Sequence, residues 1–212
     1  MRLPPVYAVL DTDVAAAHGR APLDLARAYV DGGVRFLQVR GKALSSAALL
    51  DVAAAVVALA RPYEALVVVN DRADVAVVAG ASGVHVGQDD LSPDDARAVV
   101  GSDRLVGVST HTPAQIERAA ASSADYLAVG PVFGTRTKDT GYAPVGLDLV
   151  RLAAASGKPV VAIGGITLAR APEVIAAGAA SLAVISDLLA HGDPREGAAA
   201  FVARLTGGAG TL

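Results

Sequence analysis

The feature that most constrains the fold is a regular alternation of short apolar runs with helix-like segments along the whole chain. A polar loop follows each run, and the run Leu66–Val69 is rich in β-branched residues, as expected of a strand buried on both faces of a parallel sheet. The runs are Val6–Leu10, Val34–Val39, Leu66–Val69, Gly83–Val86, Arg104–Val108, Ala124–Val129, Lys158–Ile163 and Ser181–Val184. Eight strands alternating with eight helices predict an α/β protein with a closed (β/α)8 TIM barrel. A doubly wound open sheet is the alternative, although it rarely needs so many regular units in 212 residues.

Capping residues mark several of the expected helices. Helices are expected from Pro22 to Asp31, from a cap at Ser45 to about Ala60, from a cap at Thr167 to Gly178, and from Pro194 to Leu205. The segment Asp11-Thr-Asp13 is read as a loop that ends the first strand. No linker-like stretch divides the chain, so residues 1–212 are predicted to form a single domain with a flexible tail at 207–212.

Composition excludes several classes of protein. Hydrophobic residues make up 53% of the chain and charged residues 18%, which favours packed layers over disorder. The net charge is −3 and no basic block stands out, which argues against a nucleic-acid binder. The absence of cysteine excludes disulfides, thiolate metal sites and cysteine nucleophiles.

The sequence also predicts where the protein works. No signal-peptide core follows the N-terminal Met1-Arg-Leu-Pro-Pro5. No apolar run is expected to reach the roughly 18 residues of a membrane span, because Gly, Asp or Arg interrupts each one. These patterns indicate a cytoplasmic protein with no membrane partner. Assembly into a homo-oligomer is left open.

Polar residues gather after the strands, where the active site of a barrel lies. They include Thr12, Asp13, Gln38, Arg40, Lys42, Asn70, Asp71, Gln88, Asp89, Asp90, Ser109, His111, Thr135, Thr137, Lys138, Gly164, Gly165 and Ser186. The loops at the opposite end, such as Asp31-Gly-Gly33, carry little chemistry. This asymmetry predicts one functional mouth.

The charges in the mouth fall into two groups. Arg40, Lys42 and Lys138 are cations able to neutralise a polyphosphate. Asp71 and Asp90 are hard oxygen ligands of the kind that Mg²⁺ accepts. The alternatives without a functional site are that the cations face solvent, that Asp71 pairs with its neighbour Arg72, and that Asp89 or Asp90 is an anion at a helix N-terminus. His85 is read as an ordinary strand histidine.

Two loops predict anion sites. Val129–Thr140 supplies the hydroxyls of Thr135 and Thr137 beside Lys138, although a solvated loop is an equal alternative. Gly164-Gly165 and Ile185-Ser186 follow the last two strands, where barrels commonly bind a phosphate. Two anionic substrates in one mouth suggest group transfer with pyrophosphate as the leaving group.

At this point the motifs resemble those of the thiamine-phosphate synthase family, in the family's order and over nearly the whole chain. The matching stretches are Gln38-Val-Arg-Gly-Lys42, Asn70-Asp-Arg72, Gly83-Val-His-Val-Gly-Gln-Asp-Asp90, Gly107-Val-Ser-Thr-His111, Asp125–Phe133 with Thr135-Arg-Thr-Lys138, Ala162-Ile-Gly-Gly-Ile166, and Val184-Ile-Ser186. The resemblance implies a TIM-barrel transferase. It would join 4-amino-2-methyl-5-hydroxymethylpyrimidine diphosphate to 4-methyl-5-(2-phosphoethyl)thiazole or its carboxylate, with Mg²⁺, and form thiamine phosphate and pyrophosphate.

The resemblance also implies roles for single residues. Asp71 and Asp90 would hold Mg²⁺, and Gln38 would contact the pyrimidine. The residues implied to bind pyrophosphate are Arg40, Lys42, Asn70 and Lys138, with Ser109 nearby; among these, Arg40, Ser109 and Lys138 would be catalytic. The thiazole phosphate would lie against Thr135, Thr137, Gly165, Ile185 and Ser186. In the family the C–O bond breaks largely before the thiazole nitrogen attacks, so no nucleophile or general base is required, and the ring contains no obvious catalytic dyad.

One departure from the family and two alternatives stand beside this reading. The family usually has an acidic residue where this chain has Gly41, which puts the placement of Arg40 and Lys42 in question. A thiazole tautomerase of the same fold would need a histidine at the position of Pro131. His111 could in principle transfer protons instead, but a histidine at that position also fits the synthase pattern. A non-catalytic phosphate-binding barrel would gain nothing from Asp71 and Asp90.

Overall fold

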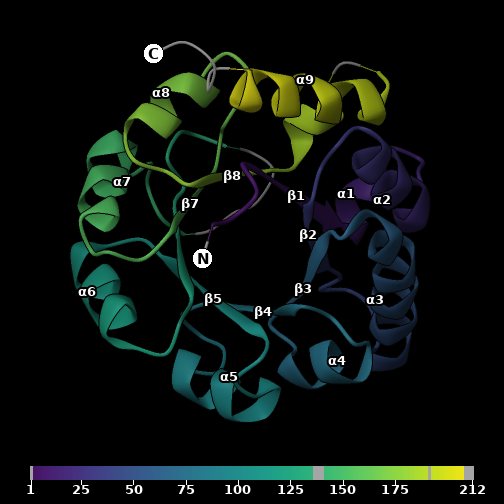
Figure 1. The fold of residues 1–212 in the computed structure, drawn as a ribbon, viewed down its shortest axis with the longest axis horizontal. Coiled ribbons are helices and arrows are strands. Elements are labelled where there is room, and N and C mark those ends of the chain that lie inside the picture. The colour runs from purple at the N-terminus through teal and green to yellow at the C-terminus, as the bar shows by residue number, and fades with distance from the viewer. Residues whose placement is uncertain (1, 136–140, 191, 208–212) are drawn as a thin grey trace.

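The computed structural model describes residues 2–135, 141–190 and 192–207. Within these ranges, eight parallel strands close into a barrel in the order of the sequence, and helices surround it (Figure 1). The strands are β1 (Val6–Asp11), β2 (Phe36–Arg40), β3 (Leu66–Asn70), β4 (Gly83–Val86), β5 (Leu105–Thr110), β6 (Tyr126–Val129), β7 (Val160–Ile163) and β8 (Ser181–Val184). The predicted (β/α)8 barrel is confirmed.

The helices cover the outside of the barrel, and α9 completes the ring between α8 and α2 (Figure 1). They are α1 (Thr12–Ala17), α2 (Pro22–Asp31), α3 (Ser46–Ala60) followed by the 3₁₀ turn η1 (Arg61–Tyr63), α4 (Ala73–Val78), α5 (Pro93–Val100), α6 (Pro113–Ala121), α7 (Gly146–Ala154), α8 (Ala171–Ala176), the 3₁₀ turn η2 (Ser186–Leu188), and α9 (Pro194–Thr206). That the chain is a single domain stays a prediction. Of the predicted tail, 208–212 lies outside the described residues.

Side chains alternate along each strand between two hydrophobic cores, because successive Cβ atoms point to opposite faces of a sheet. The larger core lies between the strands and the helices. The smaller core fills the barrel and contains Tyr7, Phe36 and Tyr126, all buried. The rings of Tyr7 and Phe36 stack with their centroids 3.8 Å apart. The aromatic packing leaves the strand ends above it to polar residues.

The prediction that Asp11-Thr-Asp13 forms only a loop is wrong. Asp11 caps helix α1, because its Oδ1 accepts hydrogen bonds from the N–H groups of Asp13 at 3.0 Å and Val14 at 3.1 Å. This is the usual role of aspartate at a helix N-terminus. Strand β1 therefore runs directly into a helix, and the end of the strand is fixed.

Helix α8 begins at Ala171 and not directly after the expected cap at Thr167. The N–H groups of Arg170 and Ala171 both donate to the Thr167 carbonyl at 3.0 Å, which forms a turn. The N–H of Leu168 donates to Asp187 Oδ2 at 2.9 Å, and this bond holds the turn against the residues after β8. Thr167 Oγ1 accepts the Arg170 N–H at 3.4 Å, so Thr167 caps this turn, which precedes the helix.

The expectation that no apolar segment could span a membrane is wrong for one helix. Ser46–Tyr63, which joins α3 and η1, is 18 residues long with a mean hydropathy of 1.4. By length and composition alone, it is long and apolar enough to cross a membrane. This helix also packs Leu49, Ala53, Val56 and Ala60 onto the barrel. Packing against the barrel also explains why this helix is apolar.

Candidate active site

Arg40 is held at the mouth by an ion pair that sequence reasoning missed. Asp11 and Arg40 lie opposite each other in the register of β1 and β2, and the Arg40 guanidinium pairs with the Asp11 carboxylate. The side chains are 14% and 5% exposed, so little water screens the pair. Arg40 Nε is buried and has no hydrogen-bond partner among the residues that the structure describes. Asp11 thus fixes one face of a predicted substrate-binding cation.

Asp71 occupies a strained position at the end of β3. Its φ of 63° is in the left-handed region, which non-glycine residues rarely adopt. The Asp71 N–H donates to the His85 carbonyl at 2.7 Å, and the Arg72 N–H donates to the Asn70 carbonyl at 2.8 Å. These bonds hold the tight turn that presents the Asp71 side chain.

Asp71 lies between a cation and a second carboxylate. Lys42 Nζ is 3.1 Å from Asp71 Oδ2. Burial raises the pKa of Asp71, contact with the Asp90 carboxylate raises that pKa further, and Lys42 lowers it. The alternative that Asp71 pairs with Arg72 is wrong, because Arg72 pairs with Asp74 at 2.6 Å. The structure therefore brings three predicted site residues, Lys42, Asp71 and Asp90, together.

The two carboxylates fit a Mg²⁺ ion that is shared with a substrate. Mg²⁺ sites commonly use one or two carboxylates and complete their coordination with water and substrate phosphates. Asp90 Oδ2 accepts the Gly87 N–H at 2.8 Å, which fixes that side chain. No cluster of three or more His, Asp or Glu ligands occurs among the described residues, so this pair leaves most coordination positions to other donors. A cation between the carboxylates would relieve their mutual repulsion.

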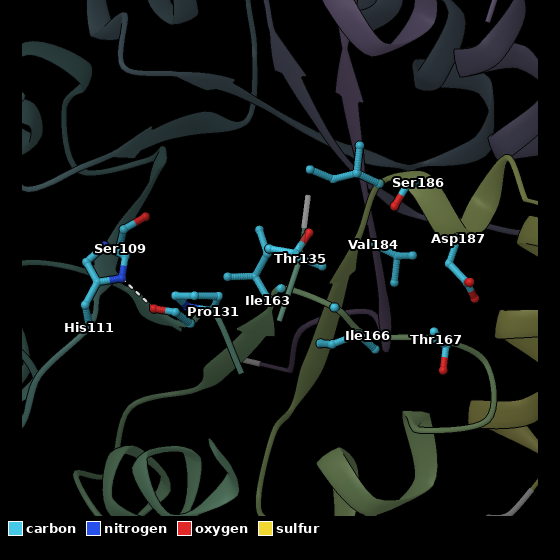
Figure 2. A pocket seen from close by; sticks show the side chains of 15 residues that line it. Ser109, His111, Pro131, Thr135, Ile163, Ile166, Thr167, Val184, Ser186 and Asp187 are labelled. Carbon is cyan, nitrogen blue, oxygen red and sulfur yellow. Dashed lines mark hydrogen bonds between the residues drawn. The ribbon is translucent and has the colours of Figure 1, made fainter. Parts of the chain in front are cut away.

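A pocket of about 130 Å³ lies at the ends of β5 to β8. Ser109 and His111 lie on one side of it, and Ser186 and Asp187 lie on the opposite side (Figure 2). Its lining includes five of the predicted substrate-binding residues: Ser109, Thr135, Gly165, Ile185 and Ser186. Pro131 also lines it, so the position that would carry the histidine of a tautomerase holds an imino acid without a titratable group.

The pocket wall after β7 requires two glycines. Gly164 and Gly165 have φ values of 98° and 63°. A methyl group on Gly165 would lie 2.6 Å from the Gly134 carbonyl oxygen and 2.8 Å from Phe133 Cβ. Among the described residues the Gly165 N–H has no hydrogen-bond acceptor. The loop thus presents a backbone N–H group to the pocket, opposite the start of η2. Phosphate sites of barrels commonly have this arrangement.

Ser109 and Gln38 are joined through the barrel interior. Gln38 Nε2 donates to Tyr7 Oη at 2.8 Å, and Tyr7 and Tyr126 share a hydrogen bond of 3.1 Å. His85 Nδ1 lies 3.1 Å from Tyr126 Oη, and His85 Nε2 lies 2.9 Å from Ser109 Oγ. The sequence did not predict this contact between Ser109 and His85, and the absence of a catalytic dyad stays a prediction. The signal available in the sequence was a histidine at an inward position of β4.

His111 is tied down beside the pocket. Its Nδ1 donates to the Gly130 carbonyl (Figure 2), its N–H donates to Gln115 Oε1 at 2.6 Å, and its ring stacks on Tyr142 at 4.0 Å. With Nδ1 bonded to a carbonyl oxygen, the ring holds the end of β5 against the end of β6. This geometry agrees with the prediction of a structural role.

Gly41 shows what replaces the acidic residue that the family usually has. It is buried, and a methyl group there would lie 2.8 Å from Leu44 Cδ1 and 3.3 Å from Leu49 Cδ1. Leucine side chains therefore occupy the space beside the loop that carries Lys42. The predicted residues Thr137 and Lys138 lie outside the described residues.

A closed barrel with a carboxylate pair and a phosphate-type loop at one mouth defines the class of TIM-barrel enzymes. The family model for thiamine monophosphate synthase (TMP-TENI) matches residues 6–188. A thiamine-phosphate synthase from Koribacter versatilis is 46% identical over 208 residues, which cover 95% of this chain and 96% of the relative. A thiamine-phosphate synthase from Chlorobium phaeovibrioides is 43% identical over 188 residues, which cover 88% and 90%.

A solved structure gives the same result. The thiamine phosphate pyrophosphorylase from Pyrococcus furiosus superposes with a TM-score of 0.88 at 28% identity, and the match covers 98% of both chains. The chain belongs to the thiamine-phosphate synthase family, so the predicted resemblance is confirmed. It is an enzyme of the transferase class.

Proposed function

We propose that this enzyme joins 4-amino-2-methyl-5-hydroxymethylpyrimidine diphosphate to 4-methyl-5-(2-phosphoethyl)thiazole, or its carboxylate, and forms thiamine phosphate and pyrophosphate. The observation that carries the proposal is the Asp71–Asp90 pair beside Lys42, which lies in the same mouth as the Gly164-Gly165 loop. The carboxylate pair with Lys42 suits a metal-bound diphosphate, and the Gly164-Gly165 loop suits a monophosphate. A transfer between two phosphorylated substrates uses both.

The residues proposed to bind the diphosphate promote cleavage of the C–O bond. Negative charge grows on pyrophosphate as the C–O bond breaks, so fixed cations stabilise the transition state more than the ground state. Arg40, anchored by Asp11, and Lys42, beside Asp71, supply such charges. Asn70 and Lys138 complete the proposed pyrophosphate set. When bound by Asp71 and Asp90, Mg²⁺ would supply Lewis-acid stabilisation of the leaving group.

The remaining parts of the mouth orient the two substrates. Gln38 contacts the pyrimidine, and Thr135, Thr137, Gly165, Ile185 and Ser186 hold the thiazole phosphate in this proposal. The pyrimidine carbocation that forms on cleavage is captured by the thiazole nitrogen. No side chain has to act as a nucleophile or a base. Ser109 donates a hydrogen bond to the departing pyrophosphate.

Pyrophosphate release tests the proposal directly. We expect release only when both substrates and Mg²⁺ are present, and expect a chelator to abolish it. Release without the thiazole phosphate would indicate a hydrolase. Isomerisation of the thiazole carboxylate phosphate by protein that releases no pyrophosphate would favour the tautomerase and would contradict the proposal.

Gly165→Ala is expected to weaken use of the thiazole phosphate. A Cβ atom would collide with the Gly134 carbonyl at 2.6 Å and would be strained at a φ of 63°. A shift of this loop by about 1 Å can reduce catalysis by about a hundredfold, and we expect that loss in kcat/KM for the thiazole phosphate. Steady-state kinetics with each substrate varied in turn would measure it.

Gly101→Ala is the matched control for this variant. Gly101 also has a positive φ, 81°, but no atom lies within 4 Å of its added methyl group, and it ends α5 away from the mouth. It should lose stability through backbone strain and keep its kcat/KM. An equal kinetic loss in both variants would mean that the phosphate site does not depend on the Gly165 backbone.

The remaining expectations are part of the same proposal. They are a cytoplasmic enzyme, small-molecule substrates, no nucleic-acid or membrane partner, and an oligomeric state left open.

A further inference from the structure

A continuous hydrogen-bonded chain crosses the inside of the barrel. It runs from Gln38 on β2 through Tyr7 on β1, Tyr126 on β6 and His85 on β4 to Ser109 on β5. Its four links measure 2.8, 3.1, 3.1 and 2.9 Å. The three middle groups are at least nine-tenths buried, and Ser109 reaches the pocket (Figure 2). The chain therefore connects a predicted pyrimidine ligand with a predicted pyrophosphate ligand.

One direction along the chain gives both tyrosine hydroxyl hydrogens in it an acceptor among the described residues. The Gln38 amide nitrogen can only donate, so Tyr7 Oη accepts from it, and Tyr126 Oη is then the one described partner left for the hydroxyl hydrogen of Tyr7. In this direction Tyr126 Oη donates to His85 Nδ1. A neutral imidazole that accepts at Nδ1 carries its hydrogen on Nε2, and this N–H donates to Ser109 Oγ.

The direction fixes what each end of the chain can do. Ser109 Oγ accepts from His85, so its own hydrogen is left to donate, and Oγ has no other hydrogen-bond partner in the described part of the chain. At the other end, Gln38 Oε1 accepts no hydrogen bond from any described residue. One end thus offers a donor, which suits an anion, and the other offers an acceptor, which suits an amino group.

Packing holds the chain in place. His85, Gly107 and Tyr126 are neighbours in the register of β4, β5 and β6. A methyl group on Gly107 would lie 2.0 Å from Tyr126 Cζ, so the glycine makes room for the end of the tyrosine ring. Tyr7 is fixed by its stacking on Phe36. Burial raises the pKa of both Tyr7 and Tyr126, so both phenols stay protonated.

We infer that His85 is a positioning residue: held by Tyr126, Tyr7 and Gln38 as the neutral Nε2–H tautomer, it turns the Ser109 hydroxyl hydrogen towards the leaving pyrophosphate. The role of Ser109 in this inference rests on the proposed function. The serine–histidine contact is then not a nucleophile–base pair, since Nε2 already carries a hydrogen and cannot accept one from Ser109.

The tautomer can be measured without any substrate. Long-range ¹H–¹⁵N spectra of ¹⁵N-histidine-labelled protein report which imidazole nitrogen is protonated, and His85→Asn assigns the signal among the four histidines. We expect His85 to be neutral with its proton on Nε2, and expect Tyr126→Phe to shift that population towards the other tautomer. A proton on Nδ1, or an imidazolium, in the wild-type enzyme would overturn the inference.

A double-mutant cycle tests the link to Ser109. Tyr126→Phe keeps the ring and removes only the hydroxyl; we expect kcat to fall about tenfold with KM nearly unchanged, as for other groups that orient a direct ligand. In a Ser109→Ala background the same change should cause no further loss, because no hydroxyl remains to be oriented. Equal losses in both backgrounds would overturn the inference.

Tyr29→Phe is the matched control, since it removes a buried phenol on α2 that lies outside the chain. It should leave kcat and the His85 signal unchanged. If the wild-type enzyme releases no pyrophosphate, the proposed function fails while the tautomer measurement still stands. If the enzyme is active and the tautomer is wrong, only the present inference fails.

Discussion

Replacing Asp71 with asparagine is expected to reduce Mg²⁺-dependent pyrophosphate release by about a thousandfold, equivalent to several kcal/mol of lost transition-state stabilisation. The variant keeps the size of the side chain, and asparagine tolerates the left-handed backbone that Asp71 adopts at a φ of 63°. Only one negative charge is removed from the pair with Asp90. The loss should therefore arise in catalysis and not in folding, which kinetics and a thermal melt on the same preparation would separate.

Asp89→Asn provides the control for this experiment. Asp89 is exposed and adjacent to Asp90, so its substitution removes the same charge from the loop that carries Asp90. It should retain nearly full release and an unchanged requirement for Mg²⁺. If Asp71→Asn and Asp89→Asn behave alike, the carboxylates act through general charge and do not form a metal site.

Asp11→Asn is expected to destabilise the enzyme by about 3 kcal/mol, because it leaves the largely buried Arg40 guanidinium without a counter-charge. Asparagine also caps helices well, so α1 should keep its N-terminal hydrogen bonds. The measured cost then belongs to the ion pair. Urea unfolding would give the stability, and pyrophosphate release would report on the placement of Arg40.

The double variant Asp11→Asn with Arg40→Gln separates these two effects. Removing the buried positive charge should restore most of the lost stability, while activity stays low because the pyrophosphate cation is missing. A double variant as unstable as Asp11→Asn alone would mean that Asp11 stabilises the fold by some route other than Arg40.

The barrel could be predicted from the sequence because each strand and most helices carry local signals. Short apolar runs located every strand, and the cap at Ser45 located a helix start. Errors occurred at two helix starts: at Asp11, where a local cap was read as a loop, and at Thr167. Thr167 caps a turn that Leu168 ties to Asp187 on the neighbouring loop, and helix α8 begins only at Ala171.

The sequence predicted which residues gather at the mouth but not which of them are in contact, and their roles stay predictions. Strand ends identified Asp71, Asp90 and Lys42 because every βα loop of a barrel opens on the same mouth. The partner of Arg40 lies 29 residues away in the chain, and Tyr7 lies 119 residues from Tyr126. Such pairings depend on strand register, which the sequence of a single chain does not specify residue by residue.

The double duty of Tyr7 and Tyr126, which fill the barrel and also carry hydrogen bonds, has a consequence for protein engineering. A library selected only for thermostability would accept phenylalanine at either position, because the ring volume is retained, as are the stacking of residue 7 on Phe36 and the edge contact of residue 126 with Phe36. Such a selection would accumulate well-folded, slow enzymes without detecting the defect. Directed evolution of this barrel therefore requires a turnover screen even for substitutions far below the mouth.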